Sequence, residues 1–455
     1  MEGAVEQQPP PPIPLTPSNS MSAGPFALSR HARLAAGDVD VVTTSRWYFY
    51  TGPMPAPETP DDECRVFSGT ANPELSAELA SFLGRPLDSI DAGRWPDGEV
   101  KIEVNVSCRN KSVYIVQPCC GYDHGTCNDS LMELLLMVST VRRSNPANII
   151  VVLPYYAYSR RTHKPDVMSR VPISAADVAQ MLTVVGTDRV VCVDLHCAQI
   201  QGFFPPSIPV DNLHAGPVGA VYFGEKGLGR LVVVSPDAGG VQRAKEFRTM
   251  LMTVTRRQVG VAMLIRQRSA DGTEIESMEL IGDVAGCACI IVDDEIVSAQ
   301  TIVRGASAVR SKGASHVFAF ATHGIFAGDA AARIDASALD EVVVSNTIPL
   351  KTDFKAALKR CPVHQLSLAP LLAETIKRLH LGQSISKLST DFDPVARPTA
   401  NSPMAPTARS SMQLHEPVVV RPEACSFAPI SPPAPVPRSL GASLSPGPTG
   451  DAPLP

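Results

Sequence analysis

Short apolar runs that alternate with segments of helical spacing limit what this chain can fold into. Six runs are rich in β-branched residues and end at polar, Gly or Pro residues: Val113–Gln117, Ile149–Pro154, Val190–Asp194, Leu231–Ser235, Cys289–Val292 and Val317–Ala321. Strands that are apolar along their whole length are typical of parallel sheets covered by helices on both faces. The pattern therefore predicts an α/β protein, with strands enough for two parallel sheets that divide near residue 214.

Two of the intervening segments carry residues that start and end helices. Ser130 with Glu133, and Ser174 with Asp177, have the spacing of a capping box, so we expect each serine to cap a helix. Apolar residues follow each serine at helical spacing and would face a sheet. Gly186 is placed to end the second helix.

The two ends of the chain differ in composition from its middle. Residues 1–63 are rich in Pro, Ala and Ser, and residues 390–455 contain repeated prolines and few aromatic residues. Such segments bury too little apolar surface to offset the entropy lost on ordering the chain. We therefore predict a disordered extension at each end.

Charge and cysteine content narrow the range of partners and compartments. The formal charge of -5 offers no overall attraction for nucleic acid or for an anionic membrane, so neither is expected as a partner. No apolar run is long enough to span a bilayer. The cysteines number 11, without a repeated spacing, and the N-terminus lacks the pattern of a secretory signal, so we expect the cytoplasm.

Polar residues at strand ends carry the candidate chemistry, because open parallel sheets bind ligands beyond the carboxyl ends of their strands. The run that begins at Val190 leads into Asp194 and His196. Alternate residues of an extended segment point to one face, so this pair could hold a divalent ion. A carboxylate that orients a structural histidine explains the same spacing equally well.

Two further strand ends are acidic. One leads into Asp237 and a Gly-Gly pair, where backbone could lie close to a ligand or form only a tight turn. The other leads into Asp293 and Asp294, then Ser298 and Thr301, which suit ribose hydroxyls followed by a phosphate. Acidic residues at three strand ends favour a magnesium–nucleotide or sugar-phosphate site.

A basic loop follows the run that begins at Ile149. It contains Arg160, Arg161, His163 and Lys164 and would suit a polyphosphate. Taken alone, such a charged run is more often a solvated loop.

Between residues 64 and 389, an ordered set of motifs resembles the ribose-phosphate pyrophosphokinases, also called phosphoribosyl pyrophosphate synthetases. The motifs that carry the resemblance are Arg65–Gly69, Val113–Gln117, Asn128–Leu135, Asp194–His196, Gln199–Phe204, Ser235–Gly240, Thr322–Phe326 and Ser345–Pro349. The resemblance implies transfer of a pyrophosphoryl group from ATP to the C1 hydroxyl of ribose 5-phosphate, with Mg²⁺ as cofactor. It also implies dimers that assemble into hexamers.

The resemblance further implies two phosphoribosyltransferase-like, Rossmann-like domains. We assign residues 64–214 to an ATP-binding domain and residues 215–365 to a ribose-5-phosphate-binding domain. Residues 366–389 would form a C-terminal helix that packs back on the N-terminal domain.

The family's functional positions can be carried over one by one. The positions that match the family's ATP-binding residues are Arg160, Arg161 and His196, together with Trp95, Asp97 and Glu99 from a neighbouring subunit. Metal binding falls on Asp194, His196 and Asp211. Ribose 5-phosphate binding falls on Asp293, Asp294, Ser298 and Thr301. Catalysis falls on His196 and Asp237, and on Arg266 and Arg268 of a mobile loop.

Several positions depart from the family pattern and keep alternatives open. Arg266 stands where the family has lysine, and a guanidinium places charge differently from an ammonium. Val297 replaces an acid of the ribose-phosphate loop, and Gln300 replaces a glycine that could need a positive φ. One alternative is a non-catalytic, synthetase-associated subunit that tunes active chains. Another is a phosphoribosyltransferase of the same fold.

Overall fold

Two mainly parallel sheets organise the part of the chain described by the computed structural model, which covers residues 41–42, 52–57, 63–163, 170–268, 275–386 and 388. The first sheet has five parallel strands, in the order β2 (Arg65–Ser68), β5 (Ser112–Val116), β6 (Asn148–Leu153), β7 (Arg189–Val193) and β8 (Val210–Leu213). The second has eight, in the order β1 (Val41–Val42), β15 (Val363–Leu366), β14 (Glu341–Ser345), β13 (His316–Gly324), β12 (Ala288–Ile296), β9 (Leu231–Ser235), β10 (Val259–Arg268) and β11 (Ile275–Ile281). Only the β10–β11 pair of that sheet is antiparallel.

These sheets confirm the predicted α/β fold class. Each of the six apolar runs forms a strand, and the two sheets separate between β8 and β9, on either side of residue 214. A third, two-stranded sheet was not predicted: β3 (Ile90–Arg94) and β4 (Val100–Val104) form an antiparallel hairpin. Its residues are mostly half-exposed, so no apolar run marked it.

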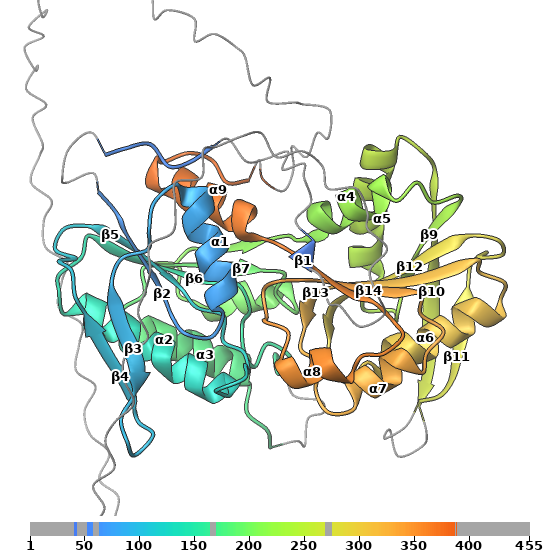
Figure 1. The fold of residues 1–455 in the computed structure, drawn as a ribbon, viewed down its shortest axis with the longest axis horizontal. Coiled ribbons are helices and arrows are strands. Elements are labelled where there is room, and N and C mark those ends of the chain that lie inside the picture. Colours follow the sequence, from blue (N-terminus) through green and yellow to red (C-terminus); the bar gives the residue numbers. More distant parts are fainter. Residues whose placement is uncertain are drawn as a thin grey trace, which may run out of the picture. The chain divides into compact units, whose positions relative to one another are not determined.

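Helices cover both faces of each sheet (Figure 1). On the first sheet, α1 (Pro73–Leu83) and α9 (Ala369–His380) lie opposite α2 (Cys127–Arg142) and α3 (Ser174–Val184). On the second, α4 (Gly216–Glu225) and α5 (Val241–Thr255) lie opposite α6 (Gln300–Ser311), α7 (Ala330–Asp335) and α8 (Thr352–Ala357). Among these described helices, none is both long enough and apolar enough to cross a bilayer.

The C-terminal helix α9 follows the second sheet in sequence but packs against α1 beside the first. Leu372 and Ile376 of α9 share an apolar cluster with Leu75 and Leu79 of α1, all fully buried. The chain thus returns to the first sheet after completing the second. The exact domain bounds stay a prediction.

Both predicted helix caps were wrong. α2 begins earlier, at a capping box made by Thr126 and Asp129. Ser130 instead donates its hydroxyl hydrogen bond to the Cys120 carbonyl, and Glu133 is engaged elsewhere. α3 begins at Ser174 without any side-chain cap, whereas its predicted stop at Gly186 is confirmed by a left-handed φ of 101°.

Two short segments of the N-terminal extension lie within the described residues and contact other elements. Val41–Val42 pairs with β15, and Met54 donates its backbone hydrogen bond to the Leu83 carbonyl. Residues 390–455 lie outside the described residues.

Candidate active site

Three consecutive carboxylates end β12 and form the centre of the candidate site. Asp294 and Glu295 are only 6% and 7% exposed at their side chains. Arg243 of α5 places its Nη1 3.2 Å from Oδ1 of both Asp293 and Asp294. Buried carboxylates are costly without a compensating charge, and Arg243 supplies one that is distant in sequence.

His196 joins this group from the first sheet. The loop after β7 brings its Nδ1 to 2.7 Å from Oδ2 of Asp294. That hydrogen bond raises the pKa of His196, although burial opposes the shift. Burial alone would raise the pKa of Asp294, but the His196 hydrogen bond and the Arg243 charge outweigh it and hold that pKa well below its ordinary range. The pair is therefore a charge-assisted hydrogen bond between the two sheets in the metal-free structure, and a bound cation would require the neutral imidazole.

The neighbouring acids have the opposite shift. Burial, followed by the charge of Asp294, raises the pKa of Asp293 well above its ordinary value. The same two causes raise the pKa of Glu295. Asp294 is thus the acid that carries the negative charge most strongly.

Arg160, predicted to bind ATP, also reaches β12. Its Nε lies 3.3 Å from Oε1 of Glu295, so the basic loop after β6 contacts the acidic strand end. Arg161 follows in the same loop and is exposed. Lys164 of the predicted basic run lies outside the described residues.

A divalent cation fits the donor set at this strand end. His196, Asp294 and Glu295 each offer a ligand atom, and these atoms lie within 4.8 Å of one another. Magnesium is usually bound by one or two carboxylates, with water and substrate phosphates completing its shell. Two carboxylates beside a solvent-accessible imidazole match that requirement.

Asp194 and His196 do not share a face as predicted. Asp194 has a φ of 41°, so the backbone turns directly after β7 instead of continuing in extended form. Its carboxylate accepts hydrogen bonds from His214 Nδ1 at 2.8 Å, Ala215 N at 2.9 Å and Thr322 Oγ1 at 2.6 Å. Asp194 is therefore placed as an acceptor that fixes this turn, outside the His196 group.

His323 holds the same turn from β13. Its Nε2 donates to the carbonyls of Val193 at 3.1 Å and Asp194 at 3.2 Å, and its Nδ1 lies 2.9 Å from Thr347 Oγ1. Burial lowers the pKa of His323, which favours the neutral ring that this arrangement needs. Since His323 pairs in register with Glu295, β13 connects the turn to the acidic strand end.

Asp211, the third predicted metal ligand, lies on β8. Its Oδ2 is 2.6 Å from Nη1 of Arg189 on the adjacent strand. The structure therefore places it in a cross-strand ion pair and not beside His196.

Asp237 occupies the turn between β9 and α5. Its Oδ1 accepts a hydrogen bond from Gly240 N at 2.9 Å, and its carbonyl accepts one from Ser235 Oγ at 2.6 Å. A side chain on Gly240 would press on Ser235 Oγ, because a Cβ there would lie 2.9 Å from it. The tight turn thus accounts for this glycine. Asp237 lies at the carboxyl end of β9, and its catalytic role stays a prediction.

The predicted ribose-phosphate loop joins β12 to α6. Ser298 accepts a hydrogen bond at its carbonyl from Arg333 Nη1, and Thr301 lies in the first turn of α6. Gln300 begins the helix, and the positive φ of this loop is at Ala299, with a value of 61°. A left-handed alanine costs about 1 kcal/mol, so the loop is held in a strained conformation.

The remaining predicted residues lie on hairpins. Trp95, Asp97 and Glu99 form the turn of the β3–β4 hairpin, where the Trp95 side chain is 51% exposed and Lys101 lies over its ring. Arg266 and Arg268 belong to the paired end of β10, not to a loop, and residues 269–274 beyond them lie outside the described residues.

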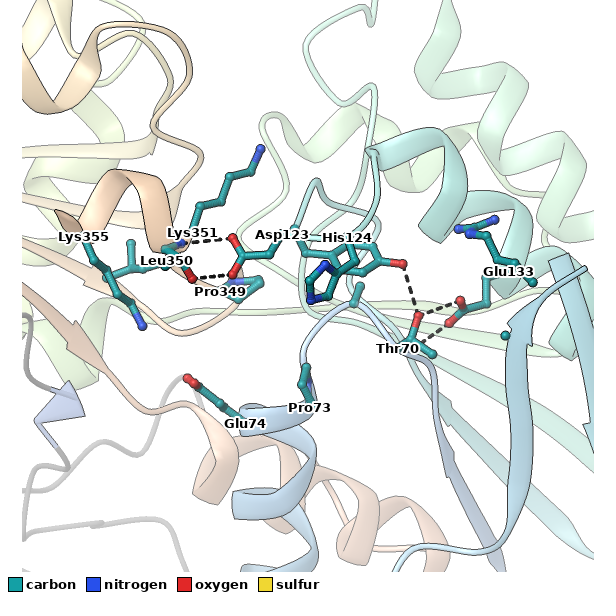
Figure 2. A pocket seen from close by; sticks show the side chains of 15 residues that line it. Thr70, Pro73, Glu74, Asp123, His124, Glu133, Pro349, Leu350, Lys351 and Lys355 are labelled. Atoms are coloured by element: carbon teal, nitrogen blue, oxygen red, sulfur yellow. Dashed lines mark hydrogen bonds between the residues drawn. The ribbon is translucent and has the colours of Figure 1, made fainter. Parts of the chain in front are cut away.

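Two cavities lie near the junction of the sheets. A small one of about 30 Å³ is lined by Asp194, His214, Arg243, Asp293 and Thr322, so it brings predicted residues of both sheets together. A larger one of about 520 Å³ contains none of the predicted site residues (Figure 2).

Sequence reasoning missed several residues of this site. Glu295 directly follows the Asp293–Asp294 pair, so a third acid was visible in the sequence. Thr322 and His323 were noted only as part of a motif. Arg243 gave no local signal, because its partners lie about fifty residues away along the chain.

The Asp194–His214 contact should make stability depend on pH. The hydrogen bond to Asp194 raises the pKa of His214 against the effect of burial; the charge of Glu246 adds to it and that of Arg243 opposes it. Its stabilising contribution is therefore complete below the ordinary value of about 6.5 and is lost as pH rises through the raised pKa. We expect the difference in thermal midpoint between the protein and a His214→Gln variant to shrink over that interval. A difference that stays constant with pH would contradict this, and His316→Gln provides an exposed control.

Comparisons with known proteins agree with this architecture. Residues 64–186 match the N-terminal domain of ribose phosphate pyrophosphokinase, and residues 232–390 match a phosphoribosyl synthetase-associated domain. The ribose-phosphate pyrophosphokinase of Bordetella pertussis is 41% identical over 326 residues, which cover 72% of this chain and 100% of the relative. That of Chromobacterium violaceum is 43% identical over 328 residues, covering 72% and 95% respectively.

A solved structure gives the same result. The crystal structure of phosphoribosylpyrophosphate synthetase from Mycobacterium smegmatis matches with a TM-score of 0.61 and 34% sequence identity, covering 70% of this chain and 99% of that one. These matches confirm the predicted family and enzyme class: the chain belongs to the ribose-phosphate pyrophosphokinase family.

Proposed function

We propose that the chain transfers the pyrophosphoryl group of ATP to the C1 hydroxyl of ribose 5-phosphate, yielding phosphoribosyl pyrophosphate and AMP for nucleotide biosynthesis. The contact between His196 and Asp294 carries this proposal, because it joins the predicted ATP side and the predicted ribose-phosphate side of the site. The relatives named for this enzyme, at 41% and 43% identity, support it.

In this reaction the protein positions the substrates and neutralises their charge, and it forms no covalent intermediate. The C1 oxygen of ribose 5-phosphate bonds to the β-phosphorus while the bond from that phosphorus to the α-phosphate bridging oxygen breaks, and AMP leaves. Arg160 and Arg161 would bind the ATP phosphates, and Arg266 and Arg268 would act on the transferred group. Holding both substrates in line supplies a large share of the rate enhancement.

His196, Asp294 and Glu295 are the residues that would hold magnesium. Asp194 and Asp211, also predicted as ligands, contact His214 and Arg189, and their metal role stays a prediction. Bound there, magnesium would neutralise charge on the polyphosphate. Asp293 lies beside this group, where it could accept hydrogen bonds from ribose hydroxyls, and Ser298 and Thr301 at the start of α6 would receive the 5-phosphate.

We extend the proposal to assembly and location. The exposed ring of Trp95 on a separate hairpin suits contact with a neighbouring subunit, where the hairpin would help bind adenine. Self-association as dimers that form hexamers is what the family resemblance implies, and it is part of this proposal. The ten cysteines of the described residues are all free thiols, which supports the cytoplasm as the compartment.

Purified protein given ATP, ribose 5-phosphate and magnesium should release AMP. Loss of the imidazole in His196→Ala should lower kcat/KM by at least about a hundredfold, as removal of one preorganised charge partner does in other enzymes. A coupled AMP-release assay measures both. His316→Ala, a change at an exposed histidine of β13, should leave the rate unaltered.

The same assay separates the alternatives. AMP that appears only after a second synthetase chain is added would replace the proposal with the regulatory-subunit function. Consumption of phosphoribosyl pyrophosphate together with a free base, without AMP release, would indicate a phosphoribosyltransferase.

The metal assignment can be tested without activity. Glu295→Gln should weaken Mn²⁺ or Mg²⁺ binding in calorimetry by about tenfold or more, since loss of one partner at a metal site costs about 10–100-fold in affinity. Glu279→Gln, at an exposed position on β11, is the matched control. Unchanged affinity in Glu295→Gln would remove Glu295 from the ligand set.

A further inference from the structure

The loop that joins β12 to α6 is held along one side by the chain that follows β13, residues 325–333 (the supporting segment). The Ile296 carbonyl accepts hydrogen bonds from two backbone amides of this segment, at 3.0 and 3.1 Å. The Val297 carbonyl accepts one from Ala327 N at 2.8 Å. Two consecutive carbonyls at the start of the loop therefore point toward the supporting segment.

Arg333 extends this support to the next carbonyl through its side chain. Its Nη1 donates a hydrogen bond to the Ser298 carbonyl at 2.9 Å. Its Nη2 lies 3.4 Å from Oδ2 of Asp329, one helical turn earlier, so the guanidinium is held from two sides. Among the described residues, Arg333 supplies the one hydrogen bond that the Ser298 carbonyl accepts.

The amides of the same three peptide groups face the other way. In a planar trans peptide, the N–H of a residue points opposite to the carbonyl of the residue before it. The amides of Val297, Ser298 and Ala299 are therefore directed away from the supporting segment. None of the three donates a hydrogen bond to another residue that the structure describes.

These amides and the start of α6 together suit an anion. Ala299 has a left-handed φ of 61° and precedes α6 without a side-chain cap, so the first amides of the helix also lack a side-chain acceptor. Successive amides around a left-handed residue form a concave anion site. Under the proposed function, the anion is the 5-phosphate of ribose 5-phosphate.

The supporting segment is anchored, whereas the loop is strained. The ring of Phe326 stacks on that of Phe354 of α8, with centroids 4.2 Å apart, and Ile334 directly after the segment is fully buried. The left-handed conformation of Ala299, in contrast, persists only while its surroundings enforce it. Loss of one support should therefore let the loop relax, and the segment should stay in place.

We propose that Arg333 is a positioning residue for ribose 5-phosphate binding. Through the Ser298 carbonyl, it holds the loop amides in the direction in which they bind the 5-phosphate. This inference rests on the proposed function, which assigns the 5-phosphate to this loop. An arginine with a purely structural role would affect the stability of the fold without distinguishing between the two substrates.

Calorimetric titration of ribose 5-phosphate into the full-length protein with magnesium tests this role. Arg333→Gln should weaken binding about tenfold or more, which is the usual effect of losing a hydrogen bond from a charged group. In the coupled AMP-release assay, the KM for ribose 5-phosphate should rise by a similar factor, while kcat and the KM for ATP stay within about twofold. Arg333→Lys keeps a donor without the planar fork and should recover part of the affinity.

Arg310→Gln is the matched control. Arg310 also donates hydrogen bonds to loop carbonyls, to that of Ser315 at 2.7 Å and that of Ala338 at 3.1 Å, but it does so from the last turn of α6. Its loss should lower the thermal midpoint and leave the affinity for ribose 5-phosphate unchanged.

Ribose 5-phosphate affinity in Arg333→Gln equal to that of the unaltered protein would overturn the inference. Equal losses of affinity for ATP and for ribose 5-phosphate would overturn it too, because they indicate a general structural defect. If the unaltered protein bound no ribose 5-phosphate, the proposed function itself would fail, so the two failures are distinguishable.

Discussion

Three adjacent carboxylates at the end of β12 impose the constraint on which the site depends. Asp293, Asp294 and Glu295 are largely buried, and such a cluster is tolerated only when cations lie close to it. The cations come from three separate places: His196 after β7, Arg160 after β6, and Arg243 on α5. Two of the three belong to the first sheet. The ion pairs between the β12 carboxylates and these cations therefore connect the two sheets. They do so at the point where a nucleotide and a sugar phosphate would meet.

The turn after β7 places His196 beside the β12 carboxylates. Asp194 takes a left-handed φ, and its carboxylate and carbonyl are held by Thr322 and His323 of β13 and by His214. An aspartate in this conformation is unusual, and the surrounding hydrogen bonds compensate for its strain. Asp194, which the spacing suggested as a metal ligand, thus fixes the turn after β7 through hydrogen bonds that join the two sheets. This arrangement links the geometry of the candidate site to the packing of β12 against β13.

Local patterns in the sequence predicted the fold well and the site only in part. Fully buried strands such as β9 and β13 appear as apolar runs, whereas the half-exposed β3–β4 hairpin has no such run. The acidic strand end was found because its residues are adjacent in the sequence. Arg243 was not found, because ion pairs between distant segments leave no trace in spacing. The alternation argument for Asp194 failed for a related reason: tertiary hydrogen bonds, not local preference, set its backbone conformation.

Under the proposed function, His196, Asp294 and Glu295 would form one metal-binding group at the junction of the two sheets. Anomalous diffraction from crystals grown with Mn²⁺ tests it most directly, because the signal locates the ion without reference to activity. We expect an anomalous peak within bonding distance of all three side chains. A peak bound instead by Asp194 or Asp211, with His196 facing away from it, would contradict this metal assignment.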